Sequence, residues 1–313
     1  MDLSIIIPGA NEFCQNVFTI QSLFSELRNS DIDFEIIYID NFCDELAKQN
    51  VKQDRSFEFL DGISKKSQTR LKVLKYSDKL SHWNAKNVGI KEAKGDVFFF
   101  CDAHCSFGGG SLVAMYKYYK ENHEKLNGTL HLPLSYILER EGRELMYKLN
   151  QKLEEGIVHY AFTSYRSYDK LITVPCMSTC GMMITRKMMV EDLGMWPAEL
   201  GIYGGGENFI NFVLAVLGKT INIFPTRYPL YHYADKRAYY YNGNDWMRNR
   251  LIAAFLHSGQ EFAKKTVDNM RGLILAKTKI FESVVYNESL IKHREKIEKK
   301  TKRSIEDFCK QWS

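Results

Sequence analysis

The sequence contains no long hydrophobic run. Its 313 residues are 45% hydrophobic and 26% charged, yet no stretch approaches the roughly 18 to 20 consecutive apolar residues of a membrane span. The opening segment, MDLSIIIPGANE, also lacks the basic region and cleavage site of a signal peptide. We therefore expect a cytoplasmic protein with a full hydrophobic core, built as one large domain or as a domain with an appendage.

Cysteine and proline are both scarce. The seven cysteines, an odd number scattered along the chain, do not form the dense framework of a small disulfide-stabilised domain, so we expect reduced thiols. The six prolines mark no domain boundary, and the chain has no internal repeat or low-complexity linker. The composition therefore argues against small secreted folds and repeat architectures.

Positive charge is concentrated in the last third of the chain. Residues 236–303 contain 16 Lys and Arg against 7 Asp and Glu, a net charge of +9, whereas the whole chain carries +5. The rest of the sequence is therefore acidic, at −4. Two interpretations stay open: ordinary solvated helix faces, or a surface that binds an anionic polymer or a membrane.

Short apolar runs alternate with amphipathic segments in the first hundred residues. The expected strands are 3–8, 34–40, 71–77 and 95–103. The expected helices are 13–30 and 82–95, the second closed by Gly95 at its C-cap. This alternation predicts a parallel, doubly wound sheet with binding loops at the strand C-termini, where Asp40 and Asp102 both fall.

The pattern changes towards the C-terminus. After a helix at 111–126 we expect further strands and helices at 129–138, 180–194, 208–219 and 220–226. From about Asp245 the periodicity is almost wholly helical. We therefore predict a catalytic domain over residues 1–243 and a basic helical C-terminal extension over residues 244–313.

The segment FFFCDAHC ends an apolar strand on polar residues. Asp102 and His104 are two residues apart on extended chain, so both side chains project to the same side and could ligate one divalent cation. An octahedral ion such as Mn²⁺ would also need a third protein group and oxygens from a substrate diphosphate. Zinc at Cys101 and Cys105 is disfavoured because no second Cys/His pair with suitable spacing follows.

Several motifs, taken in order, resemble those of GT-A-fold glycosyltransferases, particularly the polypeptide N-acetylgalactosaminyltransferase family. DAHC resembles the Asp-x-His metal motif of that family. The other similar segments are IIIPGANE, IIYID, NAKNVGIKEAKGD, VPCMSTCGMMITR, YGGGEN and YHYADKRAYYYNG. The resemblance spans roughly residues 3 to 243 and implies an α/β, Rossmann-like GT-A fold: a mixed, mostly parallel sheet flanked by helices.

The resemblance also implies roles for individual residues. It implies Asp102, His104 and His232 as ligands of Mn²⁺ or Mg²⁺, and Glu207 and Asn208 as catalytic residues that contact the sugar or the acceptor. Binding of the UDP-sugar donor is implied for Pro8, Asn11, Glu12, Asp40, Lys86, Asp102, Gly205 and Gly206, with Asp40 meeting the uracil. Departures from the family pattern at Lys86, Thr179, Cys180 and Tyr203 leave the identity of sugar and acceptor open.

The chemistry that these residues favour is metal-dependent transfer of a sugar from a UDP-sugar to a hydroxyl group, because a cation can neutralise the leaving diphosphate. The resemblance implies that the anomeric configuration is retained. The rival interpretation is a non-catalytic protein that binds nucleotide sugars or nucleic acid. A hydrolase or nucleotidyltransferase is disfavoured, since PGANE offers neither an acid pair nor a phosphate-gripping glycine loop.

The basic C-terminal segment raises the question of the acceptor. It combines cationic with aromatic side chains, a combination that suits DNA because cations bind phosphates and aromatic rings stack on bases. These residues are Lys236, Arg237, Arg248, Arg250, Lys264, Lys265 and Arg271, with Tyr239, Tyr240, Tyr241 and Trp246. The preferred hypothesis is a hydroxymethylated base in DNA of the kind found in some bacteriophages, reached by base flipping. Polysaccharide, lipid-linked glycan or protein acceptors are the alternatives.

Overall fold

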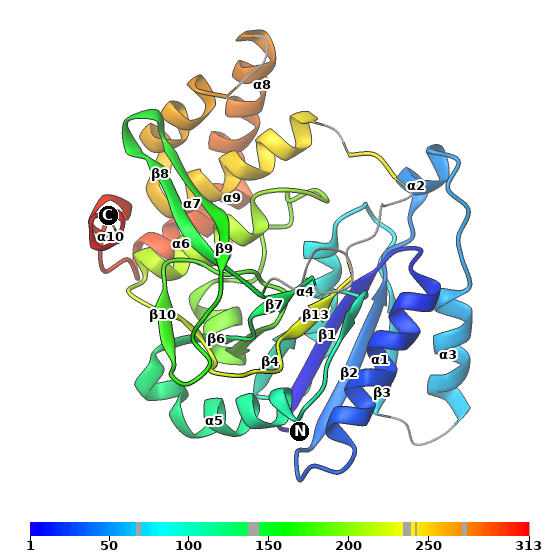
Figure 1. Ribbon diagram of the computed structural model, residues 1–313. Coiled ribbons are helices and arrows are strands. Elements are labelled where there is room, and N and C mark those ends of the chain that lie inside the picture. Colours follow the sequence, from blue (N-terminus) through cyan, green and yellow to red (C-terminus); the bar gives the residue numbers. More distant parts are fainter. Residues whose placement is uncertain (67–69, 137–143, 234–238, 242, 271–273, 313) are drawn as a thin grey trace.

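The computed structural model describes residues 1–66, 70–136, 144–233, 239–241, 243–270 and 274–312. An eight-stranded sheet in the order β10-β12-β6-β11-β4-β1-β2-β3 forms the centre of the molecule (Figure 1). Its strands are β1 (Leu3–Gly9), β2 (Phe34–Asp40), β3 (Leu71–Lys75), β4 (Val97–Phe100), β6 (Gly128–His131), β10 (Ile172–Val174), β11 (Met182–Thr185) and β12 (Thr220–Ile223).

The N-terminal half of the sheet is parallel. β1 pairs with both β2 and β4, and β2 pairs with β3. Strands β1, β2 and β4 are buried along their whole length, as their continuous apolar sequences require. In this register Gly9 lies opposite Asp40, and Ile6 lies opposite Phe100. The loops that follow the three strands therefore emerge side by side at one edge of the sheet.

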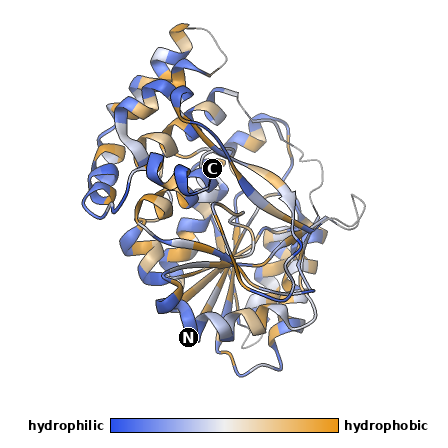
Figure 2. Ribbon diagram, turned by 60° about the vertical axis from the view of Figure 1, so that its left-hand side comes forward, coloured by the Kyte–Doolittle hydropathy of each residue, from blue (hydrophilic) through white to orange (hydrophobic). Residues whose placement is uncertain are grey.

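Helices flank this sheet. They are α1 (Phe13–Leu27), α2 (Asp44–Lys48), α3 (Ser56–Lys66), α4 (His82–Glu92), α5 (Ser111–Leu126) and α6 (Gly206–Val216), with a π-helical turn at Met188–Asp192. The C-terminal half of the sheet is mixed, because β11 runs antiparallel to β4 and β6 whereas β12 runs parallel to β6. The expected mixed, mostly parallel sheet is confirmed, and Figure 2 shows hydrophobic residues gathered on its strands.

A second sheet of five strands lies at the edge where the binding loops emerge. Its order is β5-β13-β7-β8-β9, formed by β5 (Cys105–Ser106), β13 (Leu230–His232), β7 (Leu134–Ser135), β8 (Glu144–Lys152) and β9 (Ile157–Ser164). The antiparallel β8–β9 hairpin, which turns at a short 3-10 segment (Leu153–Glu155), was not expected from the sequence. Antiparallel pairing of β13 with β5 sets His232 opposite Cys105.

The helical C-terminal region is confirmed. It consists of α7 (Gly243–Asp268, kinked at Gly259), α8 (Ile274–Val285), α9 (Glu288–Glu298) and α10 (Ile305–Gln311). Helices α7, α9 and α10 pack against α6, whereas α8 lies farther out and packs against α7 and α9 (Figure 1). Asn249 of α7 is fully buried; it accepts a hydrogen bond from the Gly201 backbone and donates one to the Tyr203 carbonyl. Within the described ranges, no helix is both long and apolar enough to cross a membrane.

One expected helix end is wrong. Helix α4 ends at Glu92, and its C-cap is Ala93 rather than Gly95. A Cβ at Gly95 would lie 2.6 Å from the backbone nitrogen of Ser4. The glycine is therefore required by the close approach of the chain to β1, not by a left-handed cap. All seven cysteines lie in the described ranges and none forms a disulfide there, in agreement with the expected reduced thiols.

Candidate active site

A cavity of about 230 Å³ opens at the C-terminal edge of the parallel strands. Such edges are where α/β sheets bind ligands. Seven of the twelve residues expected to bind the donor, hold the metal or act in catalysis line it: Pro8, Glu12, Lys86, Asp102, His104, Glu207 and Asn208. Segments far apart in the chain, from β1 to α7, thus contribute to one cavity.

Asp102, His104 and His232 converge beside this cavity. One ligand atom from each lies within 4.8 Å of the others. His232 Nε2 is 3.2 Å from Asp102 Oδ2 and 3.2 Å from His104 Nε2. His232 does not line the cavity itself; the pairing of β13 with β5 brings it to the site across 128 residues of sequence.

The geometry of His104 fits a metal ligand. Its Nδ1 lies 2.6 Å from Glu12 Oε1, and a carboxylate in that position accepts the Nδ1 proton. The Nε2 lone pair is then directed at His232 and Asp102, an arrangement found behind many metal-bound histidines. Two ligands at right angles on one ion, each bonded at about 2.1 Å, lie about 3 Å apart, close to the observed separation of the two Nε2 atoms.

The electrostatics of the site keep Asp102 ionised. Burial opposes its charge, but the hydrogen bond with His232 and the charges of Lys86 and His104 hold the pKa of this carboxyl well below its usual range. Lys86 Nζ is 3.8 Å from Asp102 Oδ1. The lysine is only 1% exposed, and its ammonium lies over the ring of Trp83 at 4.9 Å. A buried cation is thus fixed next to the Asp102 carboxylate.

Glu207 lies in the same cavity at the start of α6. It accepts hydrogen bonds from Tyr160 Oη at 2.5 Å and from Ser178 Oγ at 3.3 Å. Burial and the negative charge of Asp102 raise its pKa, against the effect of the tyrosine hydrogen bond and of Lys86. Tyr160 belongs to the unexpected hairpin, so the sequence interpretation missed this contact.

Asn208 forms hydrogen bonds with the β8–β9 hairpin. Its Nδ2 donates to the Val158 carbonyl at 3.1 Å, and its amide also meets His159 Nδ1. Burial and the charge of Arg250 lower the pKa of His159 to about 4, so the imidazole is neutral at pH 7. These bonds tie α6 to β9 at the wall of the cavity, which His159 also lines.

Gly205 and Gly206 do not line the cavity among the described residues. A Cβ at Gly205 would meet the Asn249 carbonyl oxygen at 2.0 Å, and one at Gly206 would meet the Trp83 ring at 2.2 Å. Both positions therefore require glycine because of tight packing against α7 and α4. Gly204 and Tyr203, which precede them, do line the cavity.

Asn11 and Asp40 lie outside the described cavity lining. Asn11 has φ +58°; its side chain donates to the Lys52 carbonyl and accepts from the Asp54 backbone, so it holds the 52–54 loop. Asp40 is 2% exposed and accepts a hydrogen bond from Gln53 Nε2 at 3.0 Å. Burial, reinforced by Asp54, raises the pKa of Asp40 to about 6.

The basic segment divides into two groups. Arg250, Trp246 and Tyr239 line the cavity, and the Arg250 guanidinium lies 4.6 Å from the centre of the Trp246 ring. Arg248 and Lys264 instead form ion pairs within α7, with Asp245 and Asp268 respectively. Lys236, Arg237 and Arg271 lie outside the described residues.

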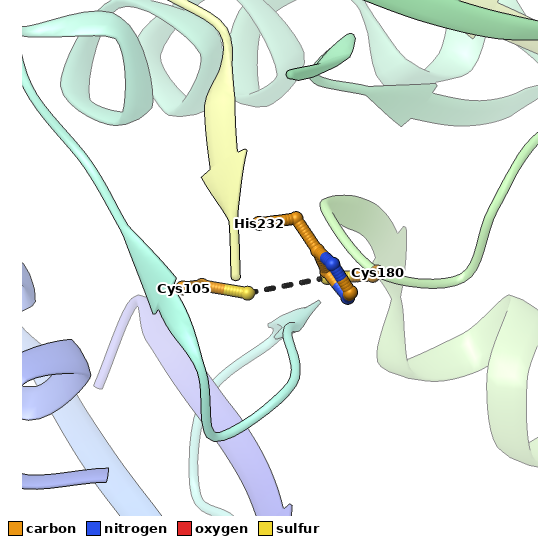
Figure 3. Close-up of side chains that lie close together, drawn as sticks. All are labelled: Cys105, Cys180 and His232. Carbon is orange, nitrogen blue, oxygen red and sulfur yellow. Dashed lines mark hydrogen bonds between the residues drawn. The ribbon is translucent and has the colours of Figure 1, made fainter. Parts of the chain in front are cut away.

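Two thiols lie close to His232. Cys105 Sγ and Cys180 Sγ are 3.5 Å apart next to His232, as Figure 3 shows. Burial raises the pKa of Cys105 to about 11 and holds that of Cys180 well above its usual range. Both sulfurs are therefore protonated at neutral pH in the absence of a bound ion.

Comparison with known proteins identifies related folds. The model of the family described as Glycosyl transferase family 2 matches residues 4–192, more than half of the chain. No curated protein matches in sequence. The structure of GalNAc-T7 with UDP, GalNAc and Mn²⁺ is similar with a TM-score of 0.66 at 16% identity, covering 96% of this chain and 57% of that one.

Another similar fold is that of S. aureus TarS, with a TM-score of 0.55 at 13% identity over 91% of this chain and 43% of TarS. Its 1-349 fragment in complex with UDP-GlcNAc gives the same TM-score and identity, with 72% of that chain covered. The chain thus spans less than two thirds of the length of GalNAc-T7 and of TarS. At these identities the similarity shows a common fold.

Proposed function

Because the chain belongs to glycosyl transferase family 2, we propose that it transfers a sugar from a UDP-sugar to an acceptor hydroxyl, with Mn²⁺ or Mg²⁺ as cofactor. The observation that carries the proposal is the convergence of Asp102, His104 and His232 at a cavity that also contains Lys86 and Glu207. A protein that only binds nucleotide sugars has no need of all these groups. The ion would neutralise the leaving diphosphate.

In this proposal each residue around the cavity has a distinct role. Asp102, His104 and His232 hold the ion, and Glu12 orients His104 through its Nδ1 proton. Lys86, fixed by its aromatic neighbours, supplies a second positive charge for the diphosphate. Its burial means that the charge is in place before the donor arrives.

Base recognition is proposed for Asp40 together with Gln53. The carboxylate holds the amide of Gln53, whose side chain is exposed and could present its remaining donor and acceptor to a uracil. UDP in the presence of Mn²⁺ should therefore raise the melting temperature of the protein, and raise it much less for Asp40→Ala. Stabilisation by an adenine nucleotide but not by UDP would redirect the assignment.

Glu207 is proposed to contact the donor sugar or to orient the acceptor hydroxyl. Its two hydrogen bonds fix the carboxylate in the cavity, a property that suits a positioning group better than a nucleophile. Retention of the donor's anomeric configuration is part of the proposal and rests on the family resemblance. NMR of the initial product distinguishes retention from inversion.

For the acceptor we propose a hydroxymethylated base in DNA, which implies a cytoplasmic location. Trp246 and Tyr239 in the cavity wall offer stacking surfaces, and Arg250 beside them offers a cation for a phosphate. Tyr240 and Tyr241, next to Tyr239 in the chain, are 87% and 54% exposed. The pairing of Arg248 and Lys264 with acids makes the free basic surface smaller than the charge count indicates.

The acceptor is tested with labelled nucleotide sugars offered in parallel to unmodified DNA, hydroxymethylated DNA and a neutral oligosaccharide, each with Mn²⁺. The proposal predicts label on hydroxymethylated DNA only. Arg250→Ala should reduce that transfer while donor hydrolysis persists, whereas Lys264→Ala, the control, should leave transfer unchanged because that lysine is paired on the helix surface. Label on the oligosaccharide and never on DNA would favour a glycan acceptor.

A further inference from the structure

Cys105, Cys180 and His232 form a compact group of ligating atoms. The two sulfurs are 3.5 Å apart, and each lies within 4.8 Å of a ring nitrogen of His232 (Figure 3). The three residues are 0%, 3% and 8% exposed, so the group is shielded from solvent. Cys180 also lines the active-site cavity, which gives an ion a way in.

The backbone fixes all three residues. Cys105 and His232 are partners in the antiparallel β5–β13 pair. The Cys180 backbone nitrogen donates to Ser178 Oγ, and the next residue, Gly181, donates to the Phe100 carbonyl at the end of β4. Strand pairing therefore places Cys105 and His232, and these two backbone hydrogen bonds hold the turn that carries Cys180 just before β11.

The two ring nitrogens of His232 have different surroundings. Nε2 faces Asp102 and His104. Nδ1 is buried and has no hydrogen-bond partner in the part of the chain that the structure describes. Buried polar atoms nearly always have a partner, so an unpartnered nitrogen in a side chain this deeply buried points to a missing ligand.

We propose that Cys105, Cys180 and His232 form a second cation site, selective for thiophilic divalent ions such as Zn²⁺, Cd²⁺ or Co²⁺. Two sulfurs and an imidazole are the ligands that these ions prefer, whereas Mn²⁺ and Mg²⁺ prefer oxygen. Two sulfurs bound tetrahedrally to Zn²⁺ at about 2.3 Å lie about 3.8 Å apart, so the observed pair needs to open only slightly.

Charge balance favours the same occupant. Each thiol releases its proton to solvent as its sulfur coordinates the ion. Two thiolates, one neutral imidazole and one dication then form a unit with no net charge, which a buried location tolerates. The fourth position of the ion is left for water from the cavity.

The site shares His232 with the proposed catalytic ion. A second dication next to the first is repelled by it, and one histidine serves both. A thiophilic ion therefore antagonises Mn²⁺. This consequence rests on the proposed function, whereas the existence of the site does not.

The site is tested with Co²⁺, whose bonds to thiolate sulfur give a characteristic ultraviolet charge-transfer absorbance. Cys14, the exposed cysteine, is first replaced by Ser in the full chain. We expect one equivalent of Co²⁺ to produce the absorbance in Cys14→Ser, and to produce it again after Cys309→Ala, a control at an equally buried thiol. The absorbance should disappear with Cys105→Ala. Its persistence in Cys105→Ala, or its absence from the parent, would overturn the proposal.

A second measurement needs no core substitution. X-ray absorption of Zn²⁺ bound to Cys14→Ser should show two sulfur neighbours at about 2.3 Å. A shell of only nitrogen and oxygen would overturn the site even if Cys105→Ala failed to fold.

A measurement of Zn²⁺ inhibition distinguishes failure of this inference from failure of the proposed function. In Mn²⁺-dependent donor hydrolysis, Cys105→Ala should raise the Zn²⁺ concentration for half-inhibition at least about tenfold, because the competing site loses one of its three protein ligands. If no variant hydrolyses any donor, the proposed function fails, and the Co²⁺ and Zn²⁺ spectra still decide whether the site exists.

Discussion

Replacing Asp40 by Asn should stabilise the protein at neutral pH. Burial, with a contribution from Asp54, raises the pKa of Asp40 from 3.8 to about 6. A carboxyl with a higher pKa in the folded chain binds its proton more tightly when folded. Its contribution to stability is therefore greatest at low pH and is lost as the pH rises from 3.8 to about 6, so the ionised form destabilises the fold at pH 7.5.

The magnitude follows from the shift. Each pKa unit corresponds to about 1.4 kcal/mol, so the ionised carboxylate costs about 3 kcal/mol at pH 7.5 and about 1.5 kcal/mol at pH 5. For a chain of this length, 3 kcal/mol corresponds to a rise in melting temperature of about 4 to 5 °C. The Asn side chain keeps an oxygen that can accept the hydrogen bond from Gln53.

The assay is thermal or urea unfolding of both proteins at pH 7.5 and pH 5. We expect the gain in unfolding free energy of Asp40→Asn over the parent protein to be about half as large at pH 5 as at pH 7.5. Asp44→Asn, at an exposed carboxylate, is the control and should change stability by less than about 0.5 kcal/mol. An equal gain in unfolding free energy at both pH values, or no gain at pH 7.5, would refute the reasoning.

Two further predictions concern the supports of the site. Glu12→Ala removes the acceptor of the His104 Nδ1 proton. It should raise the Mn²⁺ concentration for half-maximal donor hydrolysis by about 10 to 100-fold, and activity should recover at saturating Mn²⁺. An unchanged Mn²⁺ titration would contradict this role. Tyr160→Phe removes a donor from Glu207 and should lower kcat for transfer about tenfold or more while the KM for the donor stays within a few-fold; a loss confined to KM would assign the tyrosine to donor binding.

The parallel half of the sheet could be predicted because β1, β2 and β4 are mostly apolar runs between turn residues, and β3 (LKVLK) is a short β-rich segment beside them. The same reasoning located Asp102 and His104 at a strand end, where ligands bind. His232 is different, since 128 residues separate it from His104. Only the family resemblance suggested that His232 belongs to the site, because no local pattern specifies the long-range pairing of β13 with β5.

The β8–β9 hairpin shows what local patterns left out. The segment IVHYAFTS is rich in β-branched and aromatic residues and could have been recognised as a strand. The strand that pairs with it and its position next to α6 could not have been recognised from the sequence, so the contact of Tyr160 with Glu207 was missed. The charge count of the C-terminal segment was misleading for a simpler reason: the Lys264–Asp268 pair has the i,i+4 spacing of a helix ion pair and was visible in the sequence.

Metal dependence of donor cleavage tests the central claim most directly. UDP-sugar hydrolysis, measured as UDP release, should require Mn²⁺ or Mg²⁺, stop in EDTA, and resume when the ion is added back. Asp102→Ala should abolish it at every ion concentration, because the one carboxylate among the three proposed ligands is gone. Full activity in chelator, or an Asp102→Ala protein as active as the parent, would contradict the account.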